Sequence, residues 1–353
     1  MQKTSQPVLP CLLAVILALP SLALAADLAR EPVRMIFDTD IGNDVDDTMA
    51  LAMIHALQTR GECRLLGITI TKDNRYAGPM VDLLDTFYGR PDIPIGMVRG
   101  GVTPEDGKYL RLVVTAQDGG RPRYPHKLTD SSQAPEAVSL LRKLLAAEPD
   151  GSVVLVQVGF STNLARLLDS PADAALPLPG RELVQRKVRL LSTMAGAFGP
   201  GMKTRKEFNI IRDLPMAKKL FAQWPTPIVA SGWEIGNAIK HSSRSIREDY
   251  RWARQHPLVE AYGYYRGMDK DQATYDLTSV LYAVRPDRGY FDLSPPGRIT
   301  VEEDQTTSFR EEPNGPHRYL IVSPEQIARV REAQEMLCAE PTGARKAGCM
   351  SER

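Results

Sequence analysis

Residues 38–47 read DTDIGNDVDD, which places five carboxylates in ten positions directly after the apolar run VRMIF at 33–37. A short apolar run of this kind is typical of a buried strand. After the acidic stretch, Ala50, Leu51, Ile54 and Leu57 recur at helical spacing until Gly61. The pattern therefore predicts a strand, an acidic turn and a helix, which is the repeating unit of α/β proteins.

The alternation of strands and helices continues along the chain. Further buried strands are predicted at 63–71, 93–98, 153–158, 188–192 and 227–230. Helices are predicted at 80–88, 273–284 and 324–337, and another helix should start near Pro135. The polar stretch 100–132 predicts a long loop, and 289–322 predicts short strands and turns. We therefore expect an α/β fold with a mostly parallel open sheet flanked by helices.

The composition is that of a globular protein, with 43% hydrophobic and 25% charged residues among 353. A formal net charge of +1 offers no basic face, so no nucleic-acid partner is expected. No internal repeat or low-complexity linker is evident. We expect one domain at 32–340, followed by a C-terminal tail at 341–353.

The N-terminus has the pattern of a secretory signal peptide at 1–25. Lys3 precedes the apolar stretch 12–24, and small residues at Ala23 and Ala25 precede the expected cleavage site. The mature protein is then expected to be periplasmic or secreted, with no membrane segment. An uncleaved membrane anchor is the alternative, although Pro20 and the short apolar stretch disfavour it.

The four cysteines give no zinc-binding pattern. Cys11 leaves with the signal peptide, and Cys63 is expected to be buried and inert. In an oxidising compartment Cys338 and Cys349 would form a small-loop disulfide, or they remain two unpaired thiols.

The acidic turn itself allows several interpretations. Helix capping needs only one or two acids, and five clustered carboxylates repel one another unless a cation compensates them. Ligands that are all oxygen favour Ca²⁺ or Mg²⁺. An EF-hand calcium loop is excluded, because a loop that starts at Asp38 or at Asp40 has neither glycine nor glutamate at the positions where the EF-hand requires them. A metal-dependent phosphatase of the haloacid dehalogenase type also carries Asp-x-Asp after its first strand, but Gly42 stands where that family has Thr or Val.

Together with MALA at 49–52, the turn resembles the signature of the inosine–uridine-preferring nucleoside hydrolase family, whose fold is Rossmann-like. Four further blocks resemble this family in order between residues 33 and 284, and the chain beyond Pro286 is not covered by the resemblance. The blocks are GITITKDN at 67–74, GFSTNLA at 159–165, MAGA at 194–197 with EFNI at 207–210, and YDLTSVLY at 275–282.

The resemblance implies a Ca²⁺-dependent hydrolase of the N-glycosidic bond of purine and pyrimidine ribonucleosides. It implies that Asp46 is the general base, and that Ca²⁺ is held by Asp40, Asp47, Asp276 and the carbonyl oxygen of Thr162.

The resemblance also implies substrate contacts. Asn74, Glu207 and Asn209 match residues that bind the ribose, and strand alternation would point Glu207 and Asn209 to one face, with Phe208 on the other. Asp44 is expected to contact a hydroxyl, and Asp38 to order the turn by hydrogen bonds. Apart from the resemblance, Trp233 follows a predicted strand and would either stack on the base or belong to the core or a lid.

Two positions depart from the family pattern. Tyr275 stands where many members have a histidine that protonates the leaving base, and a Gly-Asn pair expected before EFNI is absent from 199–202. The alternative function is therefore a diverged, non-catalytic binder of a ribosyl ligand. The resemblance further implies a homodimer or homotetramer.

Overall fold

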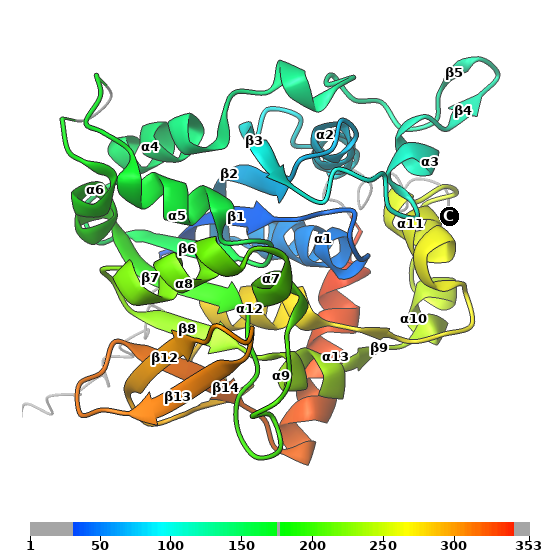
Figure 1. Ribbon diagram of the computed structural model, residues 1–353. Helices are drawn as coiled ribbons and strands as arrows, with labels where there is room; N and C mark the ends of the chain where they lie inside the picture. Colours follow the sequence, from blue (N-terminus) through cyan, green and yellow to red (C-terminus); the bar gives the residue numbers. More distant parts are fainter. Residues whose placement is uncertain (1–30, 175–176, 342–353) are drawn as a thin grey trace, which may run out of the picture. The chain divides into compact units, whose positions relative to one another are not determined.

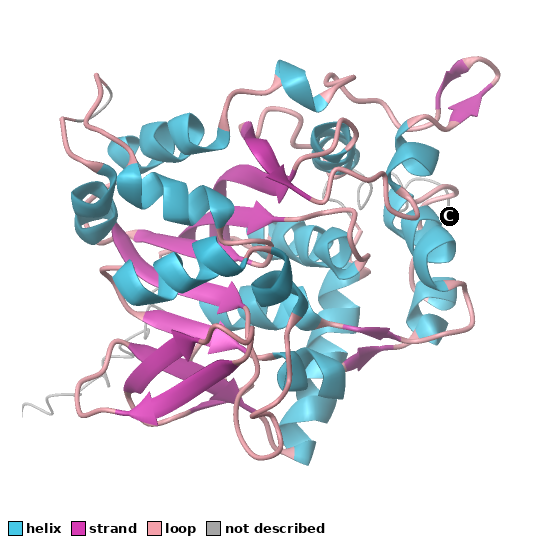
Figure 2. Ribbon diagram, viewed as in Figure 1, coloured by secondary structure: helices cyan, strands magenta, loops and turns pink. Residues whose placement is uncertain are grey.

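A ten-stranded mixed sheet with helices on both faces forms the centre of the fold (Figures 1 and 2). The computed structural model describes residues 31–174 and 177–341. Within these residues nine strands follow the order β13-β12-β14-β8-β7-β6-β1-β2-β3, and β11 pairs with β14. The strands are β1 (Val33–Thr39), β2 (Cys63–Lys72), β3 (Ile95–Val102), β6 (Val153–Gln157), β7 (Val188–Met194), β8 (Ile228–Ser231), β11 (Asp292–Leu293), β12 (Gly297–Val301), β13 (Thr307–Glu311) and β14 (His317–Ile321).

Most of the sheet is parallel. Every neighbouring pair from β3 across to β14 is parallel, and the antiparallel pairs all involve β14, β12, β13 or β11 at one edge. The predicted α/β class with a mostly parallel sheet is confirmed. The short strands predicted at 289–322 extend this same sheet as its antiparallel edge.

Alternate residues of the central strands face two separate hydrophobic cores. Met35 and Phe37 pack into one core, whereas Ile36 between them packs into the other. Helices cover both faces, as Figure 1 shows. The first core takes residues from α1 (Asp46–Thr59), α2 (Ala77–Phe87), α11 (Pro257–Arg266), α12 (Tyr275–Val284) and α13 (Pro324–Cys338), and the second from α4 (Ala137–Ala147), α5 (Thr162–Asp169), α6 (Gly180–Lys187) and α8 (Leu214–Gln223).

Shorter elements connect these layers. They include the paired strands β4 (Gln117–Asp118) with β5 (Arg121–Pro122) and β9 (Lys240–His241) with β10 (Gln272–Ala273). The short helices are α3 (Leu110–Val114), η1 (Ser131–Gln133), α7 (Phe208–Arg212), α9 (Trp233–Ala238) and α10 (Ser243–Glu248).

The stretch 100–132 is more ordered than a long loop. It contains α3, the β4–β5 pair and η1, and Tyr109 and Leu110 are fully buried. The prediction of an irregular loop was wrong here because polar residues surround a few apolar ones that anchor the segment. The Tyr109 hydroxyl donates a 2.8 Å hydrogen bond to the carbonyl oxygen of Asp44, so the segment packs against the acidic turn.

Several predictions concern the ends of the chain. Residues 1–25 and 342–353 lie outside the described residues, and so does Cys349. Among the described residues Cys338 forms no disulfide, and its buried thiol contacts the carbonyl oxygen of Met49. Burial raises the pKa of Cys63 to about 12. Among the described residues, no helix is both long and apolar enough to cross a membrane.

Candidate functional site

A pocket opens where the turn after β1 meets the carboxyl ends of β6 and β7 and the start of α12. Its volume is about 270 Å³, near the lower end for small-molecule sites. Six carboxylic acids line it, and no lysine, arginine or histidine does. The lining residues are Asp40, Asn43, Asp44, Asp46, Asp47, Val158, Met194, Glu207, Phe208, Asn209, Trp233, Tyr265, Tyr275 and Asp276.

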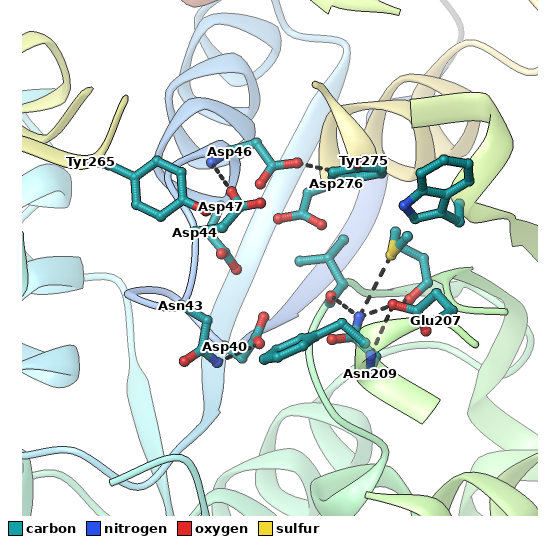
Figure 3. A pocket seen from close by; sticks show the side chains of 14 residues that line it. Asp40, Asn43, Asp44, Asp46, Asp47, Glu207, Asn209, Tyr265, Tyr275 and Asp276 are labelled. Carbon is teal, nitrogen blue, oxygen red and sulfur yellow. Dashed lines mark hydrogen bonds between the residues drawn. The ribbon is translucent and has the colours of Figure 1, made fainter. Parts of the chain in front are cut away.

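Hydrogen bonds within the turn hold its side chains in place. The Asn43 amide donates to Asp40 at 2.7 Å, and the buried Lys72 ammonium donates to the Asn43 side-chain oxygen at 2.8 Å. The backbone N–H of Asp46 donates to the Asp44 carboxylate at 2.8 Å. Figure 3 shows these acids facing a shared space. Hydrogen bonds of the protein itself therefore organise the turn.

Asp276 reaches the turn from far along the chain. It is the second residue of α12, and its backbone N–H donates to the Asp46 carboxylate at 3.1 Å. In Figure 3 its carboxylate lies beside those of Asp46 and Asp47. The pocket thus joins residues 230 positions apart, as the resemblance implied for Asp276.

Burial and mutual repulsion make the charged forms of these acids unfavourable. Burial, and then the Asp276 charge, holds the pKa of Asp46 well above its usual range. Burial, and then the Asp40 charge, raises the pKa of Asp47. Burial, and then the Asp47 charge, raises the pKa of Asp276. Burial likewise raises the pKa of Asp40 to about 6. A divalent cation would reverse this balance and keep the acids ionised.

The donor set fits a hard cation. Carboxylate oxygens of Asp44, Asp46 and Asp47 lie within 4.8 Å of one another, and all the acids are oxygen donors. This trio differs from the ligand set implied by the resemblance, which joins Asp47 to Asp40, Thr162 and Asp276. The aspartates of both sets line the same pocket.

Asp38 and Thr39 support the turn from within the sheet. The Asp38 carboxylate is fully buried and accepts hydrogen bonds from Thr69 at 2.5 Å and from the Asn163 amide at 2.8 Å. Burial raises its pKa to about 7. The Thr39 hydroxyl donates to Asp47. Asp38 is absent from the pocket lining and orders the turn through its neighbours.

Glu207 and Asn209 line the pocket opposite the acidic turn (Figure 3). The expected strand geometry is wrong, because Glu207 is the N-cap of helix α7 and its carboxylate accepts from the backbone N–H groups of Asn209 and Ile210. Phe208 therefore lines the pocket too. Burial raises the pKa of Glu207 to about 7. The Asn209 amide donates to the carbonyl oxygen of Val158 at 2.8 Å.

Two residues expected at the site do not line the pocket. The Asn74 amide donates to the carbonyl oxygen of Pro104 and to Asp106, so this side chain fastens the neighbouring loop. Thr162 is the first residue of α5, and its hydroxyl donates to Asp213 at 2.7 Å. The role of its carbonyl oxygen as a metal ligand stays a prediction.

The remaining wall of the pocket is aromatic. Trp233 at the start of α9 and Tyr275 at the start of α12 line it with Phe208 and Tyr265. Burial raises the pKa of Tyr275 to about 12. Each of the five histidines lies among the described residues, and none lines the pocket. An aromatic wall of this kind suits a planar base.

Sequence reasoning missed part of this wall. Tyr265 comes from α11, which carries no recognisable motif, and Phe208 was expected to face away. Met194 is the last residue of β7 and Val158 directly follows β6. That position was the available signal, because ligands bind at the carboxyl ends of parallel strands.

An open, mostly parallel sheet with an acidic pocket at the carboxyl ends of its strands defines an α/β protein suited to bind a cation and a small polar ligand. The sequence profile of the inosine-uridine preferring nucleoside hydrolase family matches residues 35–323. The chain belongs to this family. The match includes β12 to β14, which extends the similarity beyond residue 284. A comparison with curated proteins finds no match.

Solved structures show the same fold. A plant nucleoside hydrolase superposes with a TM-score of 0.63 at 20% identity, covering 88% of this chain and 100% of its own. An inosine-uridine preferring nucleoside hydrolase from Bacillus anthracis superposes with a TM-score of 0.63 at 15% identity, covering 87% of this chain and 99% of its own. The type III effector protein XopQ, in complex with adenosine diphosphate ribose, superposes with a TM-score of 0.63 at 15% identity, covering 88% of this chain and 95% of its own.

Proposed function

We propose that this chain hydrolyses the N-glycosidic bond of purine and pyrimidine ribonucleosides to free base and ribose, with Ca²⁺ as cofactor and Asp46 as general base. The observation that carries this proposal is the convergence of five aspartates, from the turn after β1, the start of α1 and the start of α12, on one pocket that has no basic lining residue among those described. The family assignment supports the reaction class.

The chemistry follows from the arrangement of the pocket. Cleavage of an N-ribosidic bond passes through an oxocarbenium-like state, which a nearby carboxylate stabilises. Asp46 takes the proton of the attacking water, and Glu207 and Asn209 bind ribose hydroxyls. Asp44 contacts a further hydroxyl. Asp40, Asp47, Asp276 and the Thr162 carbonyl would hold Ca²⁺, which supplies positive charge and open coordination positions for hydroxyls and water.

The general base is tested with Asp46→Asn. We expect ribose release from inosine and uridine to fall by about 10³-fold, within the range for loss of a general base. Calcium affinity, measured by calorimetry, should stay close to that of the unaltered protein. Asp92→Asn, at an exposed position, is the control. Wild-type rates in the Asp46→Asn variant would overturn the assignment of the base.

A second candidate is a binder of ribosyl ligands that does not cleave them. The absence of a histidine from the pocket lining favours it, and so does the neighbour XopQ, which was crystallised with adenosine diphosphate ribose. Incubation with inosine, uridine and adenosine plus Ca²⁺ separates the two functions by free ribose. Binding without ribose release would support the binder. A separate incubation with p-nitrophenyl phosphate tests the phosphatase alternative, which predicts phosphate release with a Mg²⁺ preference.

We also propose that the chain is exported and assembles as a homodimer or homotetramer. Export rests on the signal-peptide pattern at 1–25, and the assembly rests on the family resemblance. Cell fractionation with mass spectrometry of the mature N-terminus tests the first. Light scattering after size exclusion tests the second.

A further inference from the structure

Arg205 lies against the aromatic wall of the pocket. Its guanidinium carbon is 3.5 Å from the ring centroid of Trp233, a pocket-lining residue. This distance is well within the range of a cation–π contact. Arg205 is exposed and stands only two residues before Glu207, at the end of the loop GPGMKTRK at 199–206. The loop therefore delivers a positive charge to the rim of an otherwise acidic pocket.

The N–H groups of Arg205 are available to a ligand. Among the described residues its side chain makes no ion pair, and its only hydrogen bond in the loop is from the backbone N–H to Met202. Other arginines that lie on aromatic rings differ in this respect. Arg212 contacts the Phe208 ring but also lies 4.0 Å from Glu105. The Arg205 guanidinium keeps five N–H donors in a planar fork beside the pocket wall.

The proposed reaction needs a positive group on this wall. When the glycosidic bond breaks, its electron pair leaves with the base, and the base gains negative charge. The carboxylates of the pocket serve the ribose and would repel that charge. Among the described residues no lysine, arginine or histidine lines the pocket. Three cations lie over rings of its aromatic wall: Arg205 over Trp233 at 3.5 Å, Lys108 over Tyr265 at 4.6 Å and Arg212 over Phe208 at 5.2 Å. Arg205 is the nearest of the three to its ring.

We propose that Arg205 donates two hydrogen bonds to the N7 and O6 acceptors of a 6-oxopurine base and stabilises it as a leaving group. This inference rests on the proposed hydrolase function. The C1′–N9 bond breaks with its electron pair on the purine, while the water oxygen bonds to C1′ and the water proton passes to Asp46. The purine then takes a proton from solvent.

The geometry of the guanidinium donors determines which leaving bases Arg205 can stabilise. A guanidinium matches the paired N7 and O6 acceptors of hypoxanthine and guanine. Adenine offers a donor in place of O6, so one of the two bonds is lost. Pyrimidines present no comparable pair of acceptors. We therefore expect inosine and guanosine to be the preferred substrates.

The test compares Arg205→Ala with Lys203→Ala, which removes a charge from the same exposed loop. For inosine, kcat/KM should fall about 10- to 100-fold in Arg205→Ala, the range of a bidentate arginine contact. For p-nitrophenyl riboside, whose leaving group needs no assistance, kcat/KM should change less than about 3-fold. Arg205→Lys, which keeps the charge but loses the paired donors, should lie between. Lys203→Ala should match the wild type on both substrates.

Three results would overturn the inference. An equal loss on both substrates would show a structural role for Arg205. An unchanged rate of inosine hydrolysis in Arg205→Ala would show that Arg205 does not stabilise the leaving base. A loss confined to nucleoside 5′-phosphates would assign Arg205 to a phosphate instead. Hydrolysis of neither substrate by the wild type would overturn the hydrolase function itself, which is a distinct outcome.

Discussion

At the residue scale, Asp38 shows how a buried acid shapes a site without touching its ligand. Both of its accepted hydrogen bonds, from Thr69 and Asn163, reach one carboxylate oxygen, and the other oxygen has no partner. Asn163 is in α5 and Thr69 in β2, so Asp38 joins the acidic turn to two further elements.

Replacement of Asp38 tests this support. Asp38→Ala leaves two buried donors unsatisfied, and we expect the free energy of unfolding to fall by about 2–4 kcal/mol. Calcium affinity should weaken about 10- to 100-fold, as is usual when a group that orients metal ligands is lost. Urea unfolding and calorimetry measure the two effects.

Asp38→Asn is the matched control for this substitution. Its side-chain oxygen can still accept from Thr69 and Asn163, so we expect a change in unfolding free energy within about 1 kcal/mol. Equal losses for the alanine and asparagine variants would show that the charge of Asp38, and not its hydrogen bonds, supports the turn.

The sequence predicts the residues of the acidic turn better than those that complete the site. The placement of Asp46 and Asp47 follows from their position after a buried strand, which local pattern reveals. Asn74 also follows a strand, yet its amide is satisfied by Pro104 and Asp106. Those partners lie about thirty positions away, and no local pattern predicts them. Arg205 was missed because a cation–π contact depends on tertiary placement.

At the element scale, strand β6 ends against the acidic turn through a glycine. A Cβ atom on Gly159 would lie 2.5 Å from the backbone nitrogen of Asp40 and from the Thr71 hydroxyl. Real side chains do not tolerate such distances from backbone atoms. Gly159 therefore permits β6 to approach the turn closely enough to form one wall of the pocket.

Gly159→Ala should separate β6 from the turn. We expect ribose release and calcium affinity each to fall at least about 10-fold, because a displacement near 1 Å is costly at a site of this kind. Gly263→Ala is the control, since its added methyl would meet only Met268 at an ordinary distance of 3.4 Å. If both variants behave like the wild type, the close approach of β6 has no functional role.

The elements predicted from apolar periodicity are the ones that the structure confirms. The buried parallel strands carry continuous apolar runs, which sequence pattern reveals directly. Helix α7 was mistaken for a strand because it has only five residues and is held by the Glu207 cap rather than by an apolar face. Periodicity is uninformative over so short a segment.

At the scale of the whole molecule, buried histidines make stability depend on pH. His241 is fully buried, and neither of its ring nitrogens has a hydrogen-bond partner within 31–174 or 177–341. Burial lowers its pKa from 6.5 to about 3. The unfolded chain therefore takes up a proton as pH falls below about 6.5, while the folded protein does not. Stability conferred by neutral His241 is present above this pH and lost below it.

His241→Leu should remove this part of the acid sensitivity. Between pH 7.5 and pH 5, the unfolding free energy of the wild type should fall by about 2 kcal/mol more than that of the variant. Urea unfolding at the two pH values measures the difference. Parallel losses in both proteins would assign the acid sensitivity to other groups, among them His55, whose pKa burial also lowers to about 3.

Calcium should stabilise the whole fold, because the site joins β1 and its turn to α12, which lies more than 200 residues later in the chain. The unfolded chain cannot gather Asp40, Asp47 and Asp276, so binding favours the folded state. At a free concentration 100 times the Kd, the expected stabilisation is about 2.7 kcal/mol, which corresponds to about 4 °C in Tm. Mg²⁺ should give a smaller shift, since it demands a stricter geometry. Thermal unfolding with and without a chelator measures this shift, and Asp276→Asn should reduce it. An unchanged Tm for the wild type at every calcium concentration would rule out calcium as the cation of this pocket.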